Sequence, residues 1–149
     1  MPAHGMADEL HDVVEHRLRR IDQRYTAGRR AIIDLLVSAE HPVSIADIAE
    51  RLPSLPRSSA YRHLVDLQAA GVVRRITAND EFTRFELDEN LTGHHHHLLC
   101  VNCGKVTDIT LPAGFEQDVD KAISQLADAE SFEPLSHRLD VLGVCAGCQ

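Results

Sequence analysis

The first half of the chain shows the hydrophobic periodicity of helices. Apolar side chains recur at helical spacing from Glu9 to Ile21 and again from Ala31 to Val37. Two shorter helices are predicted to follow, one from Ser44 to Leu52 that begins at an N-capping serine and one from about Arg57 to Ala70. Gly71 comes directly after the last of these and is suited to end it. The pattern therefore predicts consecutive helices up to residue 70.

The pattern then changes to that of a β-hairpin. Val72 to Ile76 and Phe82 to Leu87 are strand-like runs, and residues 78–80 between them are turn formers. Helices followed by such a hairpin are the order of a winged helix, so we expect a winged-helix domain over residues 1–90. Residues 91–93 are expected to form a hinge before a run of histidines.

A second, smaller α/β domain is predicted over residues 94–149. Strands are expected near His95 to Cys100 and from Val106 to Ile109, followed by a helix from about Pro112 to Leu126 and a strand near Ser136 to Leu142. Helices and strands thus occur in both halves without a regular alternation. The fold class predicted for the whole chain is α+β.

The charge is divided unevenly between the halves. Residues 1–75 hold 11 Arg, no Lys and 10 acidic residues, a balance of +1, whereas residues 76–149 hold 4 basic and 13 acidic residues, a balance of −9. DNA binding depends on a local basic face and not on the net charge of −8. If the protein binds DNA, we therefore expect the first half to make the contacts.

Membrane insertion and export are not expected. No apolar run approaches the ~20 residues of a membrane-spanning helix. The first residues, which include Asp8 and Glu9, also lack the basic and apolar blocks of a signal peptide. These features predict a cytoplasmic protein.

The cysteines form two CxxC pairs, Cys100 with Cys103 and Cys145 with Cys148. Two-residue spacing lets both sulfurs of a pair approach one ion, and two pairs supply the four thiolates of a structural zinc site. In a reducing compartment such pairs indicate metal binding before disulfide formation. The 41 residues between Cys103 and Cys145 mean that this zinc would join two distant segments of one domain. Four unconnected buried cysteines are the other interpretation.

Four consecutive histidines, His94 to His97, lie just before the first cysteine pair. If they enter a strand, alternate side chains face opposite ways, with His94 and His96 on one side and His95 and His97 on the other. One run can then serve two metal sites. A solvated polar tract is the alternative.

Five segments, taken in order, carry a resemblance to a known family. They read SSAYRHL, GVVRRI, RFEL, HHHHLLCVNCGKV and SHRLDVLGVCAGC. Together they resemble the ferric uptake regulator superfamily of metal-dependent transcriptional repressors, over nearly the whole chain from about Tyr25 to Cys148. The resemblance implies an N-terminal winged helix-turn-helix domain for DNA and a small C-terminal dimerisation domain with a four-cysteine zinc site. It also implies a homodimer on a palindromic operator.

The resemblance implies one regulatory metal site on the histidine run. Its expected ligands are His94, His96, Glu116 and His137. Alignment from the C-terminal side would select Asp120 instead of Glu116, one helical turn away. We prefer Glu116 because Leu111-Pro112 sets the register from the N-terminal side.

A second regulatory site is implied by the same resemblance. Its expected ligands are Glu86, His97 and Asp108, with His95 as a further candidate. His41 lies one position before the place of the family's DNA-domain histidine, which Pro42 occupies. No cysteine remains for this site, so its nitrogen and oxygen donors suit ferrous iron, zinc, manganese or nickel, among which we prefer iron.

The predicted helix after Pro56 is expected to read DNA. In the family the tyrosine of the YR pair approaches thymine, and basic residues ahead of the second helix contact the backbone or minor groove. The matching residues here are Arg24, Tyr25, Arg29, Ser58, Ser59, Tyr61 and Arg62. The other interpretation is that Tyr61 packs and that the arginines are solvated.

The expected function is that of a metal-responsive repressor, whose metal sets the dimer for operator binding and controls metal uptake or homeostasis. A zinc, nickel or manganese regulator of the same family is the nearest alternative. From other classes we considered a zinc hydrolase built on the His94, His96, His137 and Glu116 set, and a metal buffer. No HExxH motif or nucleophile elbow occurs, so we expect no enzyme.

Overall fold

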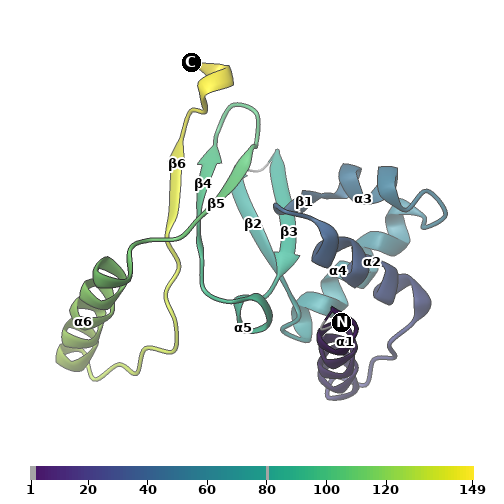
Figure 1. The fold of residues 1–149 in the computed structure, drawn as a ribbon, viewed down its shortest axis with the longest axis horizontal. Helices are drawn as coiled ribbons and strands as arrows, with labels where there is room; N and C mark the ends of the chain where they lie inside the picture. Colours follow the sequence, from purple (N-terminus) through teal and green to yellow (C-terminus); the bar gives the residue numbers. More distant parts are fainter. Residues whose placement is uncertain (1–2, 80) are drawn as a thin grey trace. The chain divides into compact units, whose positions relative to one another are not determined.

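Helices α1 to α4 and a small antiparallel sheet make up the N-terminal part of the structure, a computed structural model that describes residues 3–79 and 81–149 (Figure 1). The elements are α1 Ala3–Arg19, α2 Ala27–Ser38, β1 Val43–Ser44, α3 Ile45–Arg51, α4 Arg57–Ala69, β2 Val73–Asn79, β3 Phe82–Leu87 and α5 Glu89–Thr92. The strand order is β1-β3-β2. Helices followed by a hairpin confirm the predicted winged helix-turn-helix architecture.

Local interactions explain where these helices begin and end. Ser44 and Asp47 form a capping box, in which each side chain hydrogen bonds to the other residue's backbone N–H at the start of α3. Thr26 caps α2 by accepting from the N–H of Arg29. Gly71 follows α4 with φ +71°, a conformation that costs other residues steric strain.

Several element bounds differ from the sequence prediction. Helix α1 begins before Glu9, and β2 extends to Asn79, into the predicted turn; Asp80 lies outside the described residues. The two-residue strand β1 was not predicted, because it forms only by pairing with the distant β3 at Val43 and Phe85. The expected hinge overlaps the end of the one-turn helix α5.

The hydrophobic core of the N-terminal unit lies between its helices and its sheet. Ile32, Ile48 and Leu67, from three different helices, are fully buried in it, and Phe85 of β3 lies against them. The chain divides into this compact unit, Met1–Gly93, and a second one, His94–Gln149. No helix in the described part of the chain has both the length and the apolar character needed to cross a membrane.

A second three-stranded sheet organises the C-terminal unit. Its elements are β4 His96–Cys100, β5 Val106–Ile109, α6 Ala113–Ala129, β6 Asp140–Gly143 and the 3₁₀ helix η1 Ala146–Cys148. Strand β4 lies in the centre, antiparallel to β5 and parallel to β6. Helix α6 continues past the predicted Leu126, whereas β6 begins at Asp140, four residues later than predicted.

The C-terminal unit has a small apolar core. Among its described residues, the buried apolar side chains are Leu99, Cys100, Val106 and Ala127. Helix α6 projects away from the sheet (Figure 1). Large apolar side chains on α6 and β6 are exposed, including Phe115, Leu126 and Leu142. Burial of so few apolar side chains contributes little to the stability of this unit. Metal binding or association with another chain must therefore contribute as well.

Candidate metal centres and nucleic-acid interface

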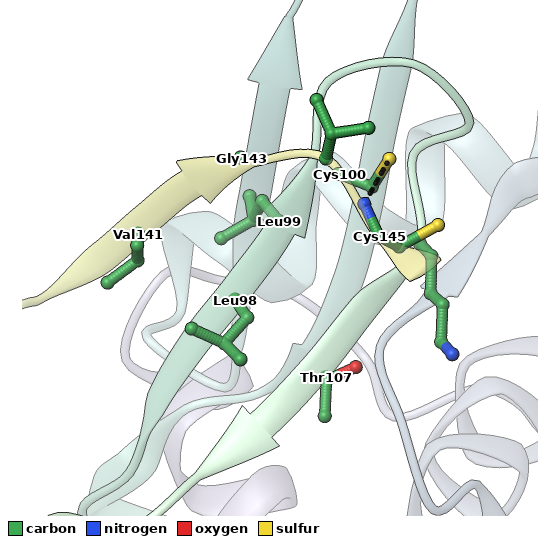
Figure 2. A pocket seen from close by; sticks show the side chains of 9 residues that line it. Leu98, Leu99, Cys100, Thr107, Val141, Gly143 and Cys145 are labelled. Carbon is green, nitrogen blue, oxygen red and sulfur yellow. Dashed lines mark hydrogen bonds between the residues drawn. The ribbon is translucent and has the colours of Figure 1, made fainter. Parts of the chain in front are cut away.

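Strands β4 and β6 bring the two CxxC pairs together. Cys100 ends β4, and its register partner on β6 is Gly143, two residues before Cys145. The backbone N–H of Cys145 donates a hydrogen bond to Cys100 Sγ over 3.4 Å (Figure 2). The sulfur atoms of all four cysteines lie within 4.8 Å of one another. The four residues are Cys100, Cys103, Cys145 and Cys148, which is the donor set of a structural zinc site.

The thiols of Cys100 and Cys148 differ in how readily they ionise. Hydrogen bonds from the backbone N–H groups of Cys145 and Cys103 lower the pKa of the Cys100 thiol to about 6. The neighbouring Cys145 and Cys103 side chains raise the pKa of Cys148 to about 12. One thiolate therefore forms easily, whereas a full set of thiolates requires a cation to offset the accumulated negative charge.

The first histidine cluster lies on one face of β4. His96 Nε2 is 2.5 Å from Glu116 Oε1, and His94 Nε2 is 3.2 Å from His137 Nε2. His137 Nε2 lies 3.3 Å from Glu116 Oε2, an oxygen that is buried without a hydrogen bond among the described residues. Three imidazoles and a carboxylate that converge in this way fit a divalent metal ion.

The structure distinguishes the two acidic candidates on α6. Glu116 faces the three imidazoles with both carboxylate oxygens. Asp120 lies 3.3 Å from the opposite ring nitrogen of His137, Nδ1. Burial raises the pKa of Glu116, but its hydrogen bond with His96 and the electrostatic effect of the nearby His96, His94 and His137 rings lower it overall. The geometry thus favours Glu116 over Asp120 at this cluster.

The opposite face of β4 carries a second group. His95 Nε2 lies 4.0 Å from Asp108 Oδ2, and His97 Nε2 lies 3.7 Å from Asp108 Oδ1. Asp108 belongs to β5, where it is the register partner of His97. The two faces are separated as the alternation of strand side chains predicts. Two imidazoles and one carboxylate thus converge within the C-terminal unit.

Two further candidates lie in the N-terminal unit. Glu86 is on β3, where its Oε1 accepts a hydrogen bond of 2.5 Å from Nε of Arg74. His41 lies in the loop after α2, and its Nδ1 is 3.0 Å from the carbonyl oxygen of Pro42. Within the part of the chain that the structure describes, His41 belongs to no group of converging ligand atoms. The contact between Arg74 and Glu86 was not predicted, because it depends on the register in which β2 pairs with β3.

Helix α4 presents most of the predicted DNA-reading residues at its N-terminal end. Ser58, Tyr61 and Arg62 are exposed, Ser59 is half-buried, and Tyr61 keeps 49% of its surface accessible. Arg62 donates a hydrogen bond to Ser59 within this turn. An exposed aromatic side chain beside a guanidinium is able to contact a base edge and a phosphate.

The residues ahead of α2 are divided between the surface and the interior. Arg24 is exposed, but Arg29 is buried, and its guanidinium bonds to the carbonyl of Arg24, the side chain of Gln23 and Asp66 of α4. The exposure expected for a DNA contact is therefore absent at Arg29. The sequence alone does not distinguish a buried arginine that bonds inside the fold from an exposed one, so the burial of Arg29 was not predicted.

Tyr25 is also held inside the N-terminal unit. Its hydroxyl lies 2.5 Å from Nδ1 of His11 on α1, and His11 Nε2 lies 2.9 Å from Asp34 of α2. Burial, opposed in part by Arg30, raises the pKa of Tyr25 to about 12. His11 was not predicted as a functional residue, since a single histidine in an amphipathic helix gives no signal for this contact.

Comparisons with known proteins agree with this arrangement. The model of the ferric uptake regulator family matches residues 20–142. The peroxide operon regulator of Bacillus subtilis strain 168 is 32% identical over 147 residues, covering 95% of this chain and 94% of that protein. The histidine run and helix α4 lie within the matched region, and the cysteine pairs lie within it or next to it.

Solved structures show the same fold. The Helicobacter pylori ferric uptake regulator, described as having three functional metal binding sites, superposes with a TM-score of 0.73 at 16% identity, covering 95% of this chain and 93% of that one. The ferric uptake regulator from Pseudomonas aeruginosa with manganese gives a TM-score of 0.68 at 25% identity, covering 87% and 95%.

We expect the substitution Cys145→Ser to abolish tight zinc binding, because a hydroxyl does not replace the fourth thiolate. Bound zinc, measured by mass spectrometry of the purified protein, is expected to fall from about one ion per chain to near zero. The unfolding temperature should fall with it, since metal binding is coupled to folding. Thr107→Ser in the same sheet is the control and should retain the zinc. Unchanged zinc content in the cysteine variant would contradict the assignment.

Proposed function

The chain belongs to the ferric uptake regulator family, and within that family of transcription regulators we propose that it acts as an iron(II)-dependent, DNA-binding repressor. Membership rests on a family match over most of the chain. Family membership argues against the hydrolase alternative, because this family consists of transcription regulators and not enzymes. Direct action on DNA also leads us to propose a cytoplasmic location.

The observation that carries the proposal is the separation of sulfur donors from nitrogen and oxygen donors. All four cysteines converge in one closed set, which suits structural zinc. The clusters on the two faces of β4 contain only imidazole and carboxylate groups. Such donors suit divalent ions of intermediate softness, and ferrous iron is one of these ions. A regulatory ion must also exchange with the pool of free metal in the cell.

We assign the regulatory ligands in two sets. One is His94, His96, Glu116 and His137 of the C-terminal unit. The other combines His95, His97 and Asp108 with Glu86, which enters this set through the resemblance of RFEL to the family pattern. Manganese, nickel and zinc bind to similar donors, and affinity order alone does not choose among them. Separate titrations of each ion into the same protein distinguish iron from these metals.

We propose that α4 reads the operator. Tyr61 would contact a base edge, while Ser58, Ser59, Arg62 and Arg24 would bind phosphate or sugar. Tyr25 and Arg29, which are held by partners inside the unit, would act by fixing the backbone that presents Arg24.

The repressor is proposed to work as a homodimer on a palindromic operator. Strand β6 is an edge strand, and its Val141 and Leu142 are 44% and 59% exposed. Leu98 and Val141 also line a shallow apolar pocket on this sheet (Figure 2). A second copy that covers the sheet edge and the apolar face of α6 would provide the burial that one chain lacks.

Metal and DNA would be linked through the dimer. An ion held by His97, Asp108 and Glu86 would restrict the N-terminal domain to an orientation that fits both operator half-sites. The same coupling free energy, typically ~1–3 kcal/mol, then acts in both directions. Iron therefore strengthens operator binding and represses transcription.

We expect iron(II) to raise the affinity for the chain's own promoter DNA by about 5–150-fold, measured by fluorescence anisotropy without oxygen. Manganese, nickel and zinc are titrated separately into protein that retains only its structural zinc. Tyr61→Ala should weaken binding with every metal, whereas Val65→Ala, also exposed on α4, should not. Binding that is indifferent to every metal would contradict the repressor proposal and favour a metal buffer.

A peroxide-responsive regulator is a second candidate, because the Bacillus subtilis relative is named a peroxide operon regulator and a Staphylococcus aureus relative that is 28% identical is named a peroxide-responsive repressor. Ferrous iron held by these imidazoles would reduce hydrogen peroxide and supply an oxidant next to the rings. In the net reaction one histidine gains one oxygen atom, and peroxide is reduced to water. The modified imidazole binds the ion less well, so the repressor would leave its operator.

If this candidate is right, peroxide should release the iron-loaded protein from DNA. Peptide mass spectrometry should then find one added oxygen on a histidine of the His94–His97 run. Manganese-loaded protein is the matched control and should keep both its DNA and its mass, because manganese(II) reduces peroxide poorly. DNA binding that survives peroxide in the iron form would remove this candidate and leave the iron sensor intact.

A further inference from the structure

Asp140 contacts the side of His97 that faces away from Asp108. Its Oδ1 lies 2.9 Å from Nδ1 of His97, whereas the Asp108 carboxylate lies 3.7 Å from Nε2. The imidazole thus has a carboxylate at each ring nitrogen, one at hydrogen-bond distance and one farther away. The two carboxylates lie at different distances from the ring, and this difference predicts which ring nitrogen is free to bind a metal ion.

The hydrogen bond to Asp140 determines the tautomer of His97. An ionised carboxylate has no proton to donate, so Nδ1 must carry the ring proton and donate it to Oδ1. A neutral imidazole has a single N–H group, and its lone pair is then on Nε2. That nitrogen faces Asp108, which belongs to the proposed ligand set.

Backbone pairing fixes the position of Asp140. Strand β6 runs parallel to β4 with Asp140 as the register partner of His97. The backbone N–H of His97 donates to the carbonyl oxygen of Leu139 over 3.3 Å, which holds the two segments together. The second carboxylate oxygen of Asp140 lies 3.8 Å from the guanidinium of Arg138. The carboxylate is therefore oriented from both sides.

The same relation occurs at the other histidine cluster. Asp120 lies 3.3 Å from Nδ1 of His137, whose Nε2 points toward Glu116. Asp120 is more exposed than Asp140, with 66% against 31% of the side chain accessible. The stronger of the two contacts is thus the one on His97.

We propose that Asp140 is the positioning residue of the His97 metal site: its carboxylate holds His97 in the tautomer that presents Nε2 to the ion. The inference rests on the proposed function, since it requires His97 to bind a regulatory metal. Asp140 does not itself bind the ion. Loss of such an outer carboxylate typically lowers metal affinity about 10–100-fold, because the ring must change tautomer and orientation before it binds.

The tautomer is measured first, by NMR of the full chain labelled with ¹⁵N-histidine and freed of labile metal. His97 is identified by the signals that disappear in His97→Gln. At a pH where the imidazoles are neutral, the wild-type protein should show a protonated Nδ1 and an unprotonated Nε2 at His97. An Nε2-protonated ring in the wild type would overturn the inference without the need for any Asp140 variant.

Metal affinity is then measured with manganese(II) as the probe, using electron paramagnetic resonance to count the free ion. Asp140→Asn should weaken one class of sites about 10–100-fold and leave the other class unchanged. Asp140→Glu, which retains an acceptor carboxylate, should recover part of the loss and the Nδ1-protonated signal. Asp128→Asn removes the same charge from an exposed position on α6 and should change neither.

The outcomes separate this inference from the proposed function. Equal manganese affinity in wild type and Asp140→Asn, or no manganese binding by the wild type, would overturn the positioning role. Structural zinc content and the unfolding temperature show whether Asp140→Asn is folded, and the wild-type tautomer decides the matter if it is not. Metal-dependent DNA binding of the wild type tests the repressor proposal independently of both measurements.

Discussion

The pairing of β4 with both β5 and β6 is the constraint on which the C-terminal chemistry depends. Strand β4 continues from the histidine run, carries His96 and His97 on opposite faces, and ends at Cys100. Antiparallel β5 places Asp108 beside His97, and parallel β6 places Asp140 on the other side of the same ring. The same β6 register carries Cys145 to Cys100. A one-residue shift of either neighbour would separate the donors, because successive side chains on a strand point to opposite faces.

The small apolar core explains why these polar groups are also structural. Few apolar side chains of the C-terminal unit are buried, while large ones on α6 and β6 remain exposed. A zinc ion that joins the two cysteine pairs would tie β4 to β6 at the end of the sheet where both strands terminate. A second copy of the chain would bury the exposed surface. The N-terminal unit differs, since helices packed on a sheet give it a continuous core of its own.

The sequence was sufficient to predict features that depend on local pattern. Helical periodicity, the Ser44 cap and the alternation along the histidine run concern neighbouring residues, and each appears in the structure. Several features that depend on the register between distant segments, and that no sequence motif marks, were missed. Strand β1 exists only through β3, and the Asp140 contact only through the register of β6. The burial of Arg29 was likewise invisible, because its partner Asp66 lies on another helix.

In the proposed mechanism, a regulatory metal and operator DNA bind cooperatively. The most direct test is to measure the iron(II) affinity of the protein without oxygen, by competition with a chromophoric chelator, with and without saturating operator DNA. Thermodynamic reciprocity predicts that DNA tightens iron binding by the same factor, about 5–150-fold, by which iron tightens DNA binding. An iron affinity that is identical with and without the operator would show that the metal and the DNA bind independently.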